Sequence, residues 1–448
     1  MADRFDVAIL GAGPAGEHAA YALSAEGRKV LLIERELIGG ECTNWACIPT
    51  KTLLRPSEVR EESERTAGVH AAALAWPDLA RYRDFMTSAG DDSARVKRYD
   101  EMGVTVVKGQ GRLDGPGRLA VDGAQFVADS ILITTGSDPV VPPVEGLQEA
   151  GYWTNREASA TYEIPASTIV LGGGPVGIEL AQFLRRFGSE VSVVQGSPRL
   201  AEREDERVSE LLAETLRTEG VDVRTGIHGQ RVRLDGDQRV LSLDDGSELR
   251  GERLLVAVGR RPRSHDIGLE TIGVEPGRGG IPIDEHCRVA DGVWAAGDCT
   301  GVMLFTHFAK YQARVAMADM RGRPVKADYR AIPRVIFTDP EVAAVGMSEA
   351  QAREAGIDVA VSRIELPTTI ARPYTYEQDP RGELSVVFDR ARRVMVGAWA
   401  VSPLASEWIH QAVLAIKAEI ELDVLLDTVA QFPSYSEAFL SALQQLPL

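Results

Sequence analysis

Short runs of consecutive apolar residues next to glycine-rich turns dominate the pattern at the start of the chain. Residues 5–10 form one run, Phe-Asp-Val-Ala-Ile-Leu, which precedes a Gly-Ala-Gly-Pro-Ala-Gly turn at 11–16 and a helical stretch at 17–25. A second apolar run at 29–33 ends in Glu34, 18 positions beyond the third glycine of the turn. This order of strand, tight turn, helix, strand and acidic residue is typical of a dinucleotide-binding fingerprint.

The same order recurs in the middle of the chain. An apolar run at 168–171 precedes Gly-Gly-Gly-Pro-Val-Gly at 172–177, and a helix at 178–187 and a strand at 190–194 follow. One glycine-rich turn alone often only ends a strand, but the full context is present both times. The glycines let backbone N–H groups approach a pyrophosphate, which the helix amino terminus also favours. Two bound dinucleotides are predicted. The glycines concerned are Gly11, Gly13, Gly16, Gly172, Gly174 and Gly177.

The remaining pattern predicts further elements and a change of character near the end. Helices are expected at about 78–102 and at 306–320, and beyond Pro324 strands are expected at 383–389 and 394–401. Further strands are predicted at 130–136, 254–259 and 292–298. Further helices are predicted near 404–418 and 434–445. The tail is therefore expected to form a separate domain.

Composition and charge exclude several classes of protein. The 448 residues are 44% hydrophobic and 26% charged, which is typical of a compact soluble protein. A net charge of −17 opposes binding to nucleic acid or to anionic membrane surfaces. The amino terminus lacks the pattern of a secretory signal, and no segment reaches 18 apolar residues. With only four cysteines, a reducing cytoplasm is expected.

The segment 39–51, Gly-Gly-Glu-Cys-Thr-Asn-Trp-Ala-Cys-Ile-Pro-Thr-Lys, is the most informative part of the sequence. On a regular helix the five-residue step from Cys42 to Cys47 separates their Cα atoms by about 8.6 Å, beyond the roughly 7 Å that a disulfide spans. If the two pair, the helix must bend between them. Two unpaired core thiols, or a zinc site completed by Cys287 or Cys299, are the alternatives, although no CxxC motif or histidine pair supports zinc. No metal site is predicted.

These motifs, in this order, resemble the flavoprotein disulfide reductases, the family of glutathione reductase, dihydrolipoamide dehydrogenase and mercuric reductase. The resemblance covers nearly the whole chain. It rests on both fingerprints, the segment 39–51, the Ile-Thr-Thr-Gly stretch at 133–136, Val-Gly-Arg-Arg-Pro at 258–262 and Ala-Gly-Asp at 296–298. It implies an α/β fold with two Rossmann-like domains, for FAD and for NAD(P)H, and a C-terminal α+β dimerisation domain. The implied boundaries are 1–148 and 261–325 for FAD, 149–260 for NAD(P)H and 326–448 for the interface.

The resemblance also implies where FAD binds. Together with the first glycine turn, Glu34 would hold the pyrophosphate and adenosine ribose, and Asp298 would bond the ribityl chain. A helix starting near Thr306 would direct its amino terminus at the flavin. Further cofactor contacts are implied for Thr135, Gly136, Gly259 and Arg260.

The resemblance assigns the redox chemistry to a small set of side chains. Cys47 would lie against the flavin and accept its electrons, whereas Cys42 would be the outer sulfur that meets the acceptor. Lys51 and Glu179 would form an ion pair beside the flavin, where a cation stabilises the negative charge that develops on reduction. The active site would be shared across a homodimer.

The second fingerprint favours NADPH as the electron donor. Its second strand leads to Gln195, where an acidic residue would hold the ribose 2′-hydroxyl of NADH. Arg199 and Arg203 follow and suit a 2′-phosphate. NADH remains possible, since both arginines could instead lie on a solvated loop or pair with the acidic residues at 202–205.

The carboxyl-terminal region departs from the disulfide-reducing members of the family. Those members have a His-Pro segment with a glutamate five residues after the histidine. The histidine transfers the proton to and from the outer thiol. Here Phe432 occupies the histidine position, while Pro433 and Glu437 remain. Mercuric reductases resemble this chain because they also have Phe-Pro at this place. A ketone-cleaving carboxylase of the family has the phenylalanine as well. The mercuric reductases have a terminal cysteine pair, however, and this chain ends Gln-Leu-Pro-Leu.

The sequence therefore predicts an NAD(P)H-dependent flavoprotein with a redox-active disulfide. Its expected acceptor is a small molecule that needs little general-base help, such as a quinone, a metal ion or another electrophile. A dihydrolipoamide dehydrogenase-like thiol–disulfide oxidoreductase and a ketone-cleaving enzyme are alternatives. A non-enzymatic flavin-bearing redox sensor is a third.

Overall fold

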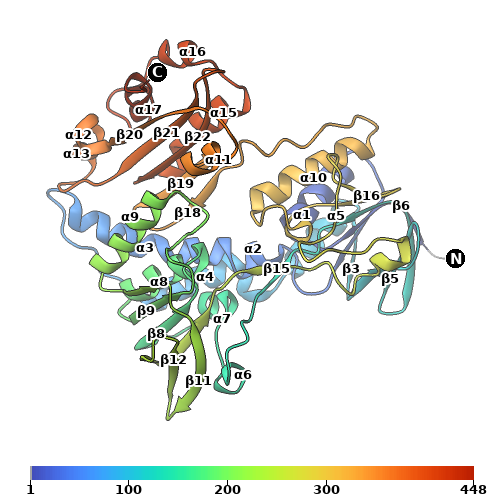
Figure 1. The fold of residues 1–448 in the computed structure, drawn as a ribbon. Helices are drawn as coiled ribbons and strands as arrows, with labels where there is room; N and C mark the ends of the chain where they lie inside the picture. Colours follow the sequence, from blue (N-terminus) through green and yellow to red (C-terminus); the bar gives the residue numbers. More distant parts are fainter. Residues whose placement is uncertain (1–2, 448) are drawn as a thin grey trace. The chain divides into compact units, whose positions relative to one another are not determined.

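The computed structural model describes residues 3–447 (Figure 1). Within that range no helix is long and apolar enough to cross a membrane. The chain forms two compact units. Unit 1 comprises Met1–Thr50, Arg81–Val140 and Gly259–Ala327, and unit 2 comprises Lys51–Ala80, Val141–Val258 and Asp328–Leu448. Two helices pass from one unit into the other, α3 (Cys47–Arg65) and α4 (Trp76–Thr87).

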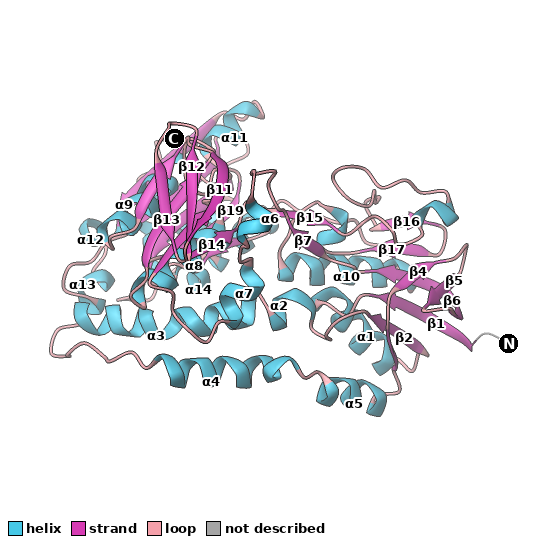
Figure 2. Cartoon of the chain, turned by 90° about the horizontal axis from the view of Figure 1, so that it is seen from below, coloured by secondary structure: helices cyan, strands magenta, loops and turns pink. Residues whose placement is uncertain are grey.

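Unit 1 is built on a largely parallel sheet with the strand order β16-β17-β6-β1-β2-β3, extended by the antiparallel strands β4 and β5 (Figure 2). Its strands are β1 (Asp3–Leu10), β2 (Val30–Glu34), β3 (Thr105–Lys108), β4 (Gly111–Leu113), β5 (Arg118–Val121), β6 (Ala124–Ile133), β16 (Arg288–Ala290) and β17 (Val293–Ala295), with β7 (Ser137–Pro139) and β15 (Arg260–Pro262) as a separate antiparallel pair. Its helices are α1 (Pro14–Ala25), α2 (Gly40–Asn44), α5 (Ser93–Glu101) and α10 (Thr306–Met320).

The central strands of unit 1 are apolar on both faces because both faces are covered. Successive side chains of a strand point to opposite sides. Val7 and Ile9 accordingly belong to a core shared with α1 and α10, whereas Ala8 and Leu10 belong to a second core under β4 and β5. The consecutive apolar run at 5–10 is thus the signature of a doubly covered strand.

Unit 2 repeats the strand–turn–helix arrangement in a smaller parallel sheet with the order β10-β9-β8-β14, next to an antiparallel sheet of β11, β12 and β13. The strands are β8 (Ser167–Leu171), β9 (Glu190–Gln195), β10 (Asp222–Thr225), β11 (Gly229–Asp235), β12 (Gln238–Leu243), β13 (Glu248–Gly251) and β14 (Arg253–Val256). The helices are α6 (Leu147–Ala150), α7 (Asn155–Ala160), α8 (Pro175–Arg186) and α9 (Glu206–Thr218).

The carboxyl-terminal part of unit 2 is an antiparallel sheet with the order β18-β19-β22-β21-β20. Its strands are β18 (Arg334–Ile336), β19 (Glu341–Gly346), β20 (Val359–Glu365), β21 (Glu383–Asp389) and β22 (Val394–Ser402). The helices are α11 (Glu349–Glu354), α12 (Leu366–Thr369), α13 (Arg372–Tyr376), α14 (Ala405–Trp408), α15 (His410–Lys417), α16 (Leu422–Leu426) and α17 (Glu437–Gln444).

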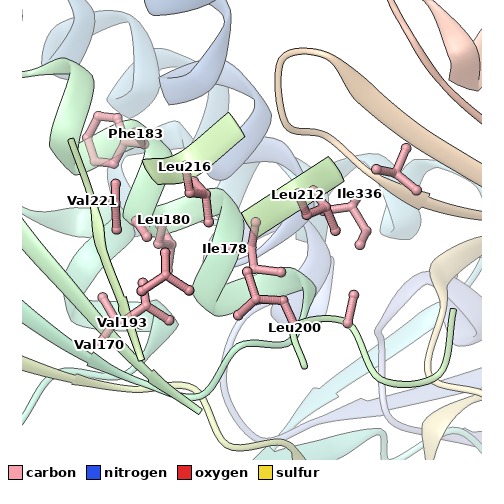
Figure 3. Close-up of a cluster of buried hydrophobic side chains, with 14 of the residues drawn as sticks. Val170, Ile178, Leu180, Phe183, Val193, Leu200, Leu212, Leu216, Val221 and Ile336 are labelled. Atoms are coloured by element: carbon pink, nitrogen blue, oxygen red, sulfur yellow. The ribbon is translucent and has the colours of Figure 1, made fainter. Parts of the chain in front are cut away.

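One apolar cluster joins the two parts of unit 2. Ile178 and Leu180 of α8 and Leu212 of α9 belong to this cluster, beside β8 and β9 (Figure 3). Ile336 and Trp399 of the carboxyl-terminal sheet belong to the same cluster. The nucleotide-binding half and the carboxyl-terminal sheet therefore share a core within this unit.

Several predicted elements differ in detail from those observed. The helix expected over 78–102 is divided by a 3₁₀ turn at Ser88–Gly90, where Ala89 has a φ of +49° that a continuous right-handed helix does not tolerate. The helix near 434–445 begins only at Glu437, and the one near 404–418 is split after Trp408. By contrast, the helix at 306–320 and the strand at 383–389 have the predicted bounds.

Phe183 tests the shared core of unit 2. Its side chain is fully buried and its ring lies 5.8 Å from that of Trp76 and 5.2 Å from that of Phe187. Phe183→Ala should lower the free energy of unfolding by about 3–5 kcal/mol, measured by urea denaturation. Leu234→Ala, at a half-exposed position in the same unit, is the control and should cost under about 1 kcal/mol. Equal effects of the two substitutions would contradict this assignment of the core.

Candidate functional site

The three glycines of the first turn have two different roles. A Cβ on Gly11, whose φ is +109°, would lie 2.4 Å from the Thr134 carbonyl oxygen, and one on Gly16 would lie 2.0 Å from the Gly11 carbonyl oxygen. Both glycines are therefore required by the close packing of strand, turn and helix. A Cβ on Gly13, directly before α1, would meet no atom within 4 Å. This open space at the helix amino terminus fits an anionic group such as a pyrophosphate.

The second turn repeats this division. A Cβ on Gly172 (φ +111°) would lie 2.3 Å from the Ala257 carbonyl oxygen, and one on Gly177 would lie 2.0 Å from the Gly172 carbonyl oxygen. Gly174, directly before α8, again faces open space. The two turns therefore offer equivalent anion-binding geometry in the two units.

The residues that end the second strand of each unit are also equivalent. Glu34 accepts the Ala12 N–H through Oε2 at 2.8 Å, and Gln195 accepts the Gly173 N–H through Oε1 at 2.7 Å. Glu34 further accepts the Glu36 N–H through Oε1 at 2.7 Å. A carboxylate has about four acceptor positions, so Glu34 can still accept from the hydroxyl groups of a ribose. Gln195 offers the same oxygen without a negative charge.

The helix break that a Cys42–Cys47 pair requires is present. Helix α2 ends at Asn44, Trp45 has φ −140° and ψ −3°, and α3 begins at Cys47. Both cysteines are thiols in the structure, and they are close enough for Cys47 to raise the pKa of Cys42. The two sulfurs are therefore within reach despite the five-residue step.

The disulfide segment is fastened to the first glycine turn. The Gly39 N–H donates to the Ala12 carbonyl oxygen at 2.8 Å. A Cβ on Gly40, whose φ is +56°, would lie 2.9 Å from the Gly13 Cα. The two consecutive glycines before Cys42 therefore let its backbone approach the turn that faces the open space. Nucleotide turn and thiol pair form one rigid assembly in unit 1.

Helix α10 supplies a polar partner of the thiol pair. The Cys47 Sγ and Thr306 Oγ1 atoms lie 3.4 Å apart, and Thr306 is the first residue of the helix. The hydrogen bond to Cys47, burial and the charge of Cys47 raise the pKa of Cys42, while Thr306 and Lys310 act in the opposite direction. The proximity of Cys47 therefore opposes ionisation of Cys42, and the start of α10 favours it.

Asp298 lies at the end of a hydrogen-bonded chain in unit 1. The Ser137 hydroxyl donates to Asp298 Oδ2 at 2.6 Å, and Arg260 Nε donates to the Ser137 Oγ at 2.8 Å. Glu41 lies 3.7 Å from the Arg260 guanidinium. Burial raises the pKa of Asp298, against the stabilising Ser137 hydroxyl and Arg260 charge. Asp298 is thus positioned by Ser137 and, through it, by Arg260.

The predicted contacts at 135–136 and 259–260 meet across the β7–β15 pair. The Thr135 hydroxyl donates to the Arg263 carbonyl oxygen at 2.6 Å, and the Arg263 N–H donates to the Gly136 carbonyl oxygen at 2.9 Å. The Val140 N–H donates to the Gly259 carbonyl oxygen at 2.9 Å. These residues therefore connect the two ends of the antiparallel pair β7–β15 in unit 1.

Lys51 and Glu179 form the predicted ion pair, here within unit 2. The Lys51 Nζ lies 2.6 Å from Glu179 Oε2, and the Glu179 carboxylate is 4% exposed. Glu179 Oε1 also accepts the Phe337 N–H at 2.9 Å, and the Phe337 ring lies 4.7 Å from the Lys51 Nζ. Lys51 follows Cys47 by one turn of α3. These contacts hold the Lys51 ammonium group at a defined place on α3, the helix that begins with Cys47.

The two arginines after Gln195 differ in how firmly they are held. Arg199 donates to the Glu202 and Glu204 carbonyl oxygens at 2.7 and 2.8 Å and to the Ser209 hydroxyl at 2.7 Å. Arg203 is exposed. Arg199 therefore fixes the loop, whereas Arg203 is accessible to a ligand.

Phe432, at the position of the expected histidine, and Glu437, the retained glutamate, differ in burial. Phe432 is 70% exposed, while Glu437 begins α17 and has a buried Oε2 without a hydrogen-bond partner among residues 3–447. Tyr435, between them, is buried, and its ring stacks 6.2 Å from that of Trp408. Tyr435 is thus a core aromatic of unit 2.

Comparison with known families decides what this constellation is. A family model described as pyridine nucleotide-disulphide oxidoreductase matches residues 5–317. The chain belongs to this family. A second model, the dimerisation domain of pyridine nucleotide-disulphide oxidoreductases, matches residues 332–443.

Similar proteins of this family extend over the whole chain. A dihydrolipoyl dehydrogenase of Chlorobaculum tepidum is 34% identical over 467 residues, covering 100% of this chain and 98% of its own. A mercuric reductase of Bacillus cereus is 31% identical, covering 97% and 70%. Among solved structures, LpdA of Mycobacterium tuberculosis superposes with a TM-score of 0.88 at 27% identity, covering 99% of both chains. A Cu(II) complex of the HOCl-induced flavoprotein disulfide reductase RclA of Escherichia coli gives 0.87 at 28% identity, covering 98% and 99%.

Membership of this pyridine nucleotide-disulphide oxidoreductase family confirms several predictions. The protein is an NAD(P)H-dependent flavoprotein oxidoreductase with a mixed α/β fold, an FAD-binding region and a carboxyl-terminal dimerisation domain. The open space at Gly13 and the acceptor oxygens of Glu34 fit the pyrophosphate and ribose of FAD.

Two contacting residues were not found from the sequence. Ser137 directly follows the Thr135-Gly136 pair, so its position was a usable signal. Phe337 contacts Lys51 and Glu179 from a distant part of the chain. No local pattern indicates that contact.

Proposed function

We propose that this enzyme passes electrons from NADPH, by way of FAD, to a disulfide of Cys42 and Cys47, and from there to a small electrophile. The acceptor is a quinone, a metal ion or another electrophile that needs little proton transfer. Phe432 carries this proposal, because an exposed phenyl ring stands where a proton-transferring side chain would be needed. Loss of a positioned base typically costs about 10²–10⁴ in rate, so a glutathione-like disulfide is a poor acceptor.

The side chains on this route have distinct tasks. FAD, held by the first glycine turn and Glu34, would supply the two-electron chemistry that links the nicotinamide to the disulfide. Cys47, held by Thr306 at 3.4 Å, is the inner sulfur, and Cys42 is the outer one. Lys51, fixed by Glu179, provides a positive charge that favours the reduced state of the site.

The relatives support an electrophilic acceptor and also a second candidate. The mercuric reductase of Bacillus cereus and the Cu(II) complex of RclA are named for metal ions. Besides Cys42 and Cys47 the sequence has only Cys287 and Cys299, and both are buried, so neither is exposed to a metal ion. The dihydrolipoyl dehydrogenase of Chlorobaculum tepidum, together with the retained Glu437, favours lipoamide-like turnover as the second candidate.

The assembly and nucleotide choice complete the proposal. The dimerisation domain supports a homodimer whose active site is shared, and the cysteine content supports a cytoplasmic location. Gln195 lacks the negative charge that would repel a 2′-phosphate, and the exposed Arg203 is near it in sequence. NADPH is therefore the preferred donor.

Cys47→Ser should abolish the long-wavelength absorption between thiolate and flavin in the two-electron-reduced enzyme, since it removes the inner sulfur. Cys42→Ser is the matched control and should show this absorption already before NADPH is added, because without a disulfide its Cys47 is a free thiolate beside the oxidised flavin; NADPH should then bleach it. Anaerobic titration with NADPH under a spectrophotometer measures both. Retention of the band in Cys47→Ser would overturn the order of the two sulfurs.

Phe432→His should raise turnover with lipoamide or glutathione disulfide by at least about tenfold, because it restores a proton-transfer group. Turnover with a quinone should change little. Phe432→Leu removes the ring without adding a base and should raise neither rate. No gain in the correctly folded histidine variant, with steady-state NADPH oxidation as the assay, would contradict the role assigned to Phe432.

Gln195→Glu should shift the preference from NADPH towards NADH by about tenfold in the ratio of kcat/KM values, equivalent to about 1.4 kcal/mol. The new carboxylate would repel a 2′-phosphate and accept from a 2′-hydroxyl. Gln230→Glu adds the same charge at an exposed position of unit 2 and should leave the ratio unchanged. An unchanged ratio in Gln195→Glu would refute the selection mechanism.

A further inference from the structure

If Phe432 stands in place of the base, Cys42 has no proton-transfer group to activate it. The inference below rests on that proposed function. A thiol attacks an electrophile as its thiolate. The hydrogen bond to Cys47, burial and the Cys47 charge together raise the pKa of Cys42. An unassisted Cys42 would therefore be a poor nucleophile at neutral pH.

Helix α10 presents a cation on the side of the thiol pair. Thr306 begins this helix and its Oγ1 lies 3.4 Å from the Cys47 Sγ. Lys310 follows Thr306 by four residues, so the two lie one turn apart on the same helix face. Both act on Cys42 in the direction that lowers its pKa, Thr306 by a hydrogen bond and Lys310 by its charge.

The charge of Lys310 is not neutralised by an ion pair. Lys310 is exposed, and within residues 3–447 no carboxylate pairs with it. Burial raises the pKa of Glu17 on the neighbouring helix α1, and Arg95 and the Tyr99 hydroxyl, which donates to Glu17 Oε1 at 3.3 Å, oppose this more strongly than the charge of Lys310 does.

The other titratable group facing Lys310 does not compete for its charge. Burial, and then the charges of Arg314, Lys310 and Arg321, lower the pKa of His18. Because His18 is held neutral, it neither neutralises Lys310 nor adds a charge beside it. The positive charge of Lys310 is therefore available to Cys42.

We propose that Lys310 is a positioning residue that stabilises the thiolate of Cys42 and so compensates electrostatically for the missing base. The Cys42 proton leaves to water, and the thiolate forms a bond to the electrophilic acceptor. The Cys47 thiolate then attacks the Cys42 sulfur, the Cys42–acceptor bond breaks and the disulfide forms. The acceptor departs with the electron pair and takes any protons it needs from water.

The test is the rate at which iodoacetamide, a neutral reagent, alkylates Cys42 in the NADPH-reduced holoenzyme between pH 6 and pH 10. Peptide mass spectrometry identifies the modified sulfur. Lys310→Met should slow alkylation about two- to fivefold on the rising part of the pH profile, as for loss of one exposed charge pair. In 1 M salt the difference should shrink, because dissolved ions screen the charge of an exposed lysine. Lys310→Arg should restore the wild-type profile.

Lys326→Met is the matched control. Lys326 is an exposed lysine of the same unit that pairs with Glu285 at 2.9 Å, so its loss changes the net charge equally. Its profile should match the wild type. An unshifted profile for Lys310→Met, or an equal shift in Lys326→Met, would overturn the role of Lys310. Alkylation of Cys47 in place of Cys42 in the wild type would instead overturn the proposed order of the sulfurs.

Discussion

The interruption of the helix between Asn44 and Cys47 is the constraint on which the rest of the site depends. A continuous helix would hold the two sulfurs too far apart to exchange electrons as a disulfide. Ending α2 at Asn44 and restarting at Cys47 brings them into contact. Because α3 begins at Cys47, Lys51 lies one turn of this helix beyond the inner sulfur. Local backbone geometry therefore sets both the redox pair and its neighbouring cation.

Close backbone approach then locks the redox pair to the cofactor turn. Gly39 and Gly40 allow the segment to contact Ala12 and Gly13, and Glu34 accepts the N–H of the same Ala12. In unit 2 the second turn repeats this geometry with Gln195 in place of the acid. The two turns thus share one geometry, and the residues that accept their backbone N–H groups differ in charge. If Phe432 stands in place of a base, as we propose, the charge of Lys310 assists the activation of Cys42.

Much of this architecture could be predicted because it depends on local chemistry. The glycine turns, the end of β2 at Glu34 and the helix break all follow from rules that act over a few residues. What the sequence did not reveal depends on distant contacts. Phe337 meets Lys51 from a segment far along the chain, and the 3₁₀ turn at Ser88–Gly90 interrupts an otherwise regular helical pattern. The burial of Tyr435 against Trp408 likewise depends on tertiary packing.

The central claim is that NADPH reduces a disulfide between Cys42 and Cys47, and a count of thiols tests it most directly. The chain has four cysteines, of which Cys287 and Cys299 are buried in unit 1. Thiols are counted with a chromogenic disulfide reagent after denaturation, before and after anaerobic reduction with one equivalent of NADPH. The account predicts two thiols in the oxidised enzyme and four after reduction. Four thiols in both samples would contradict it.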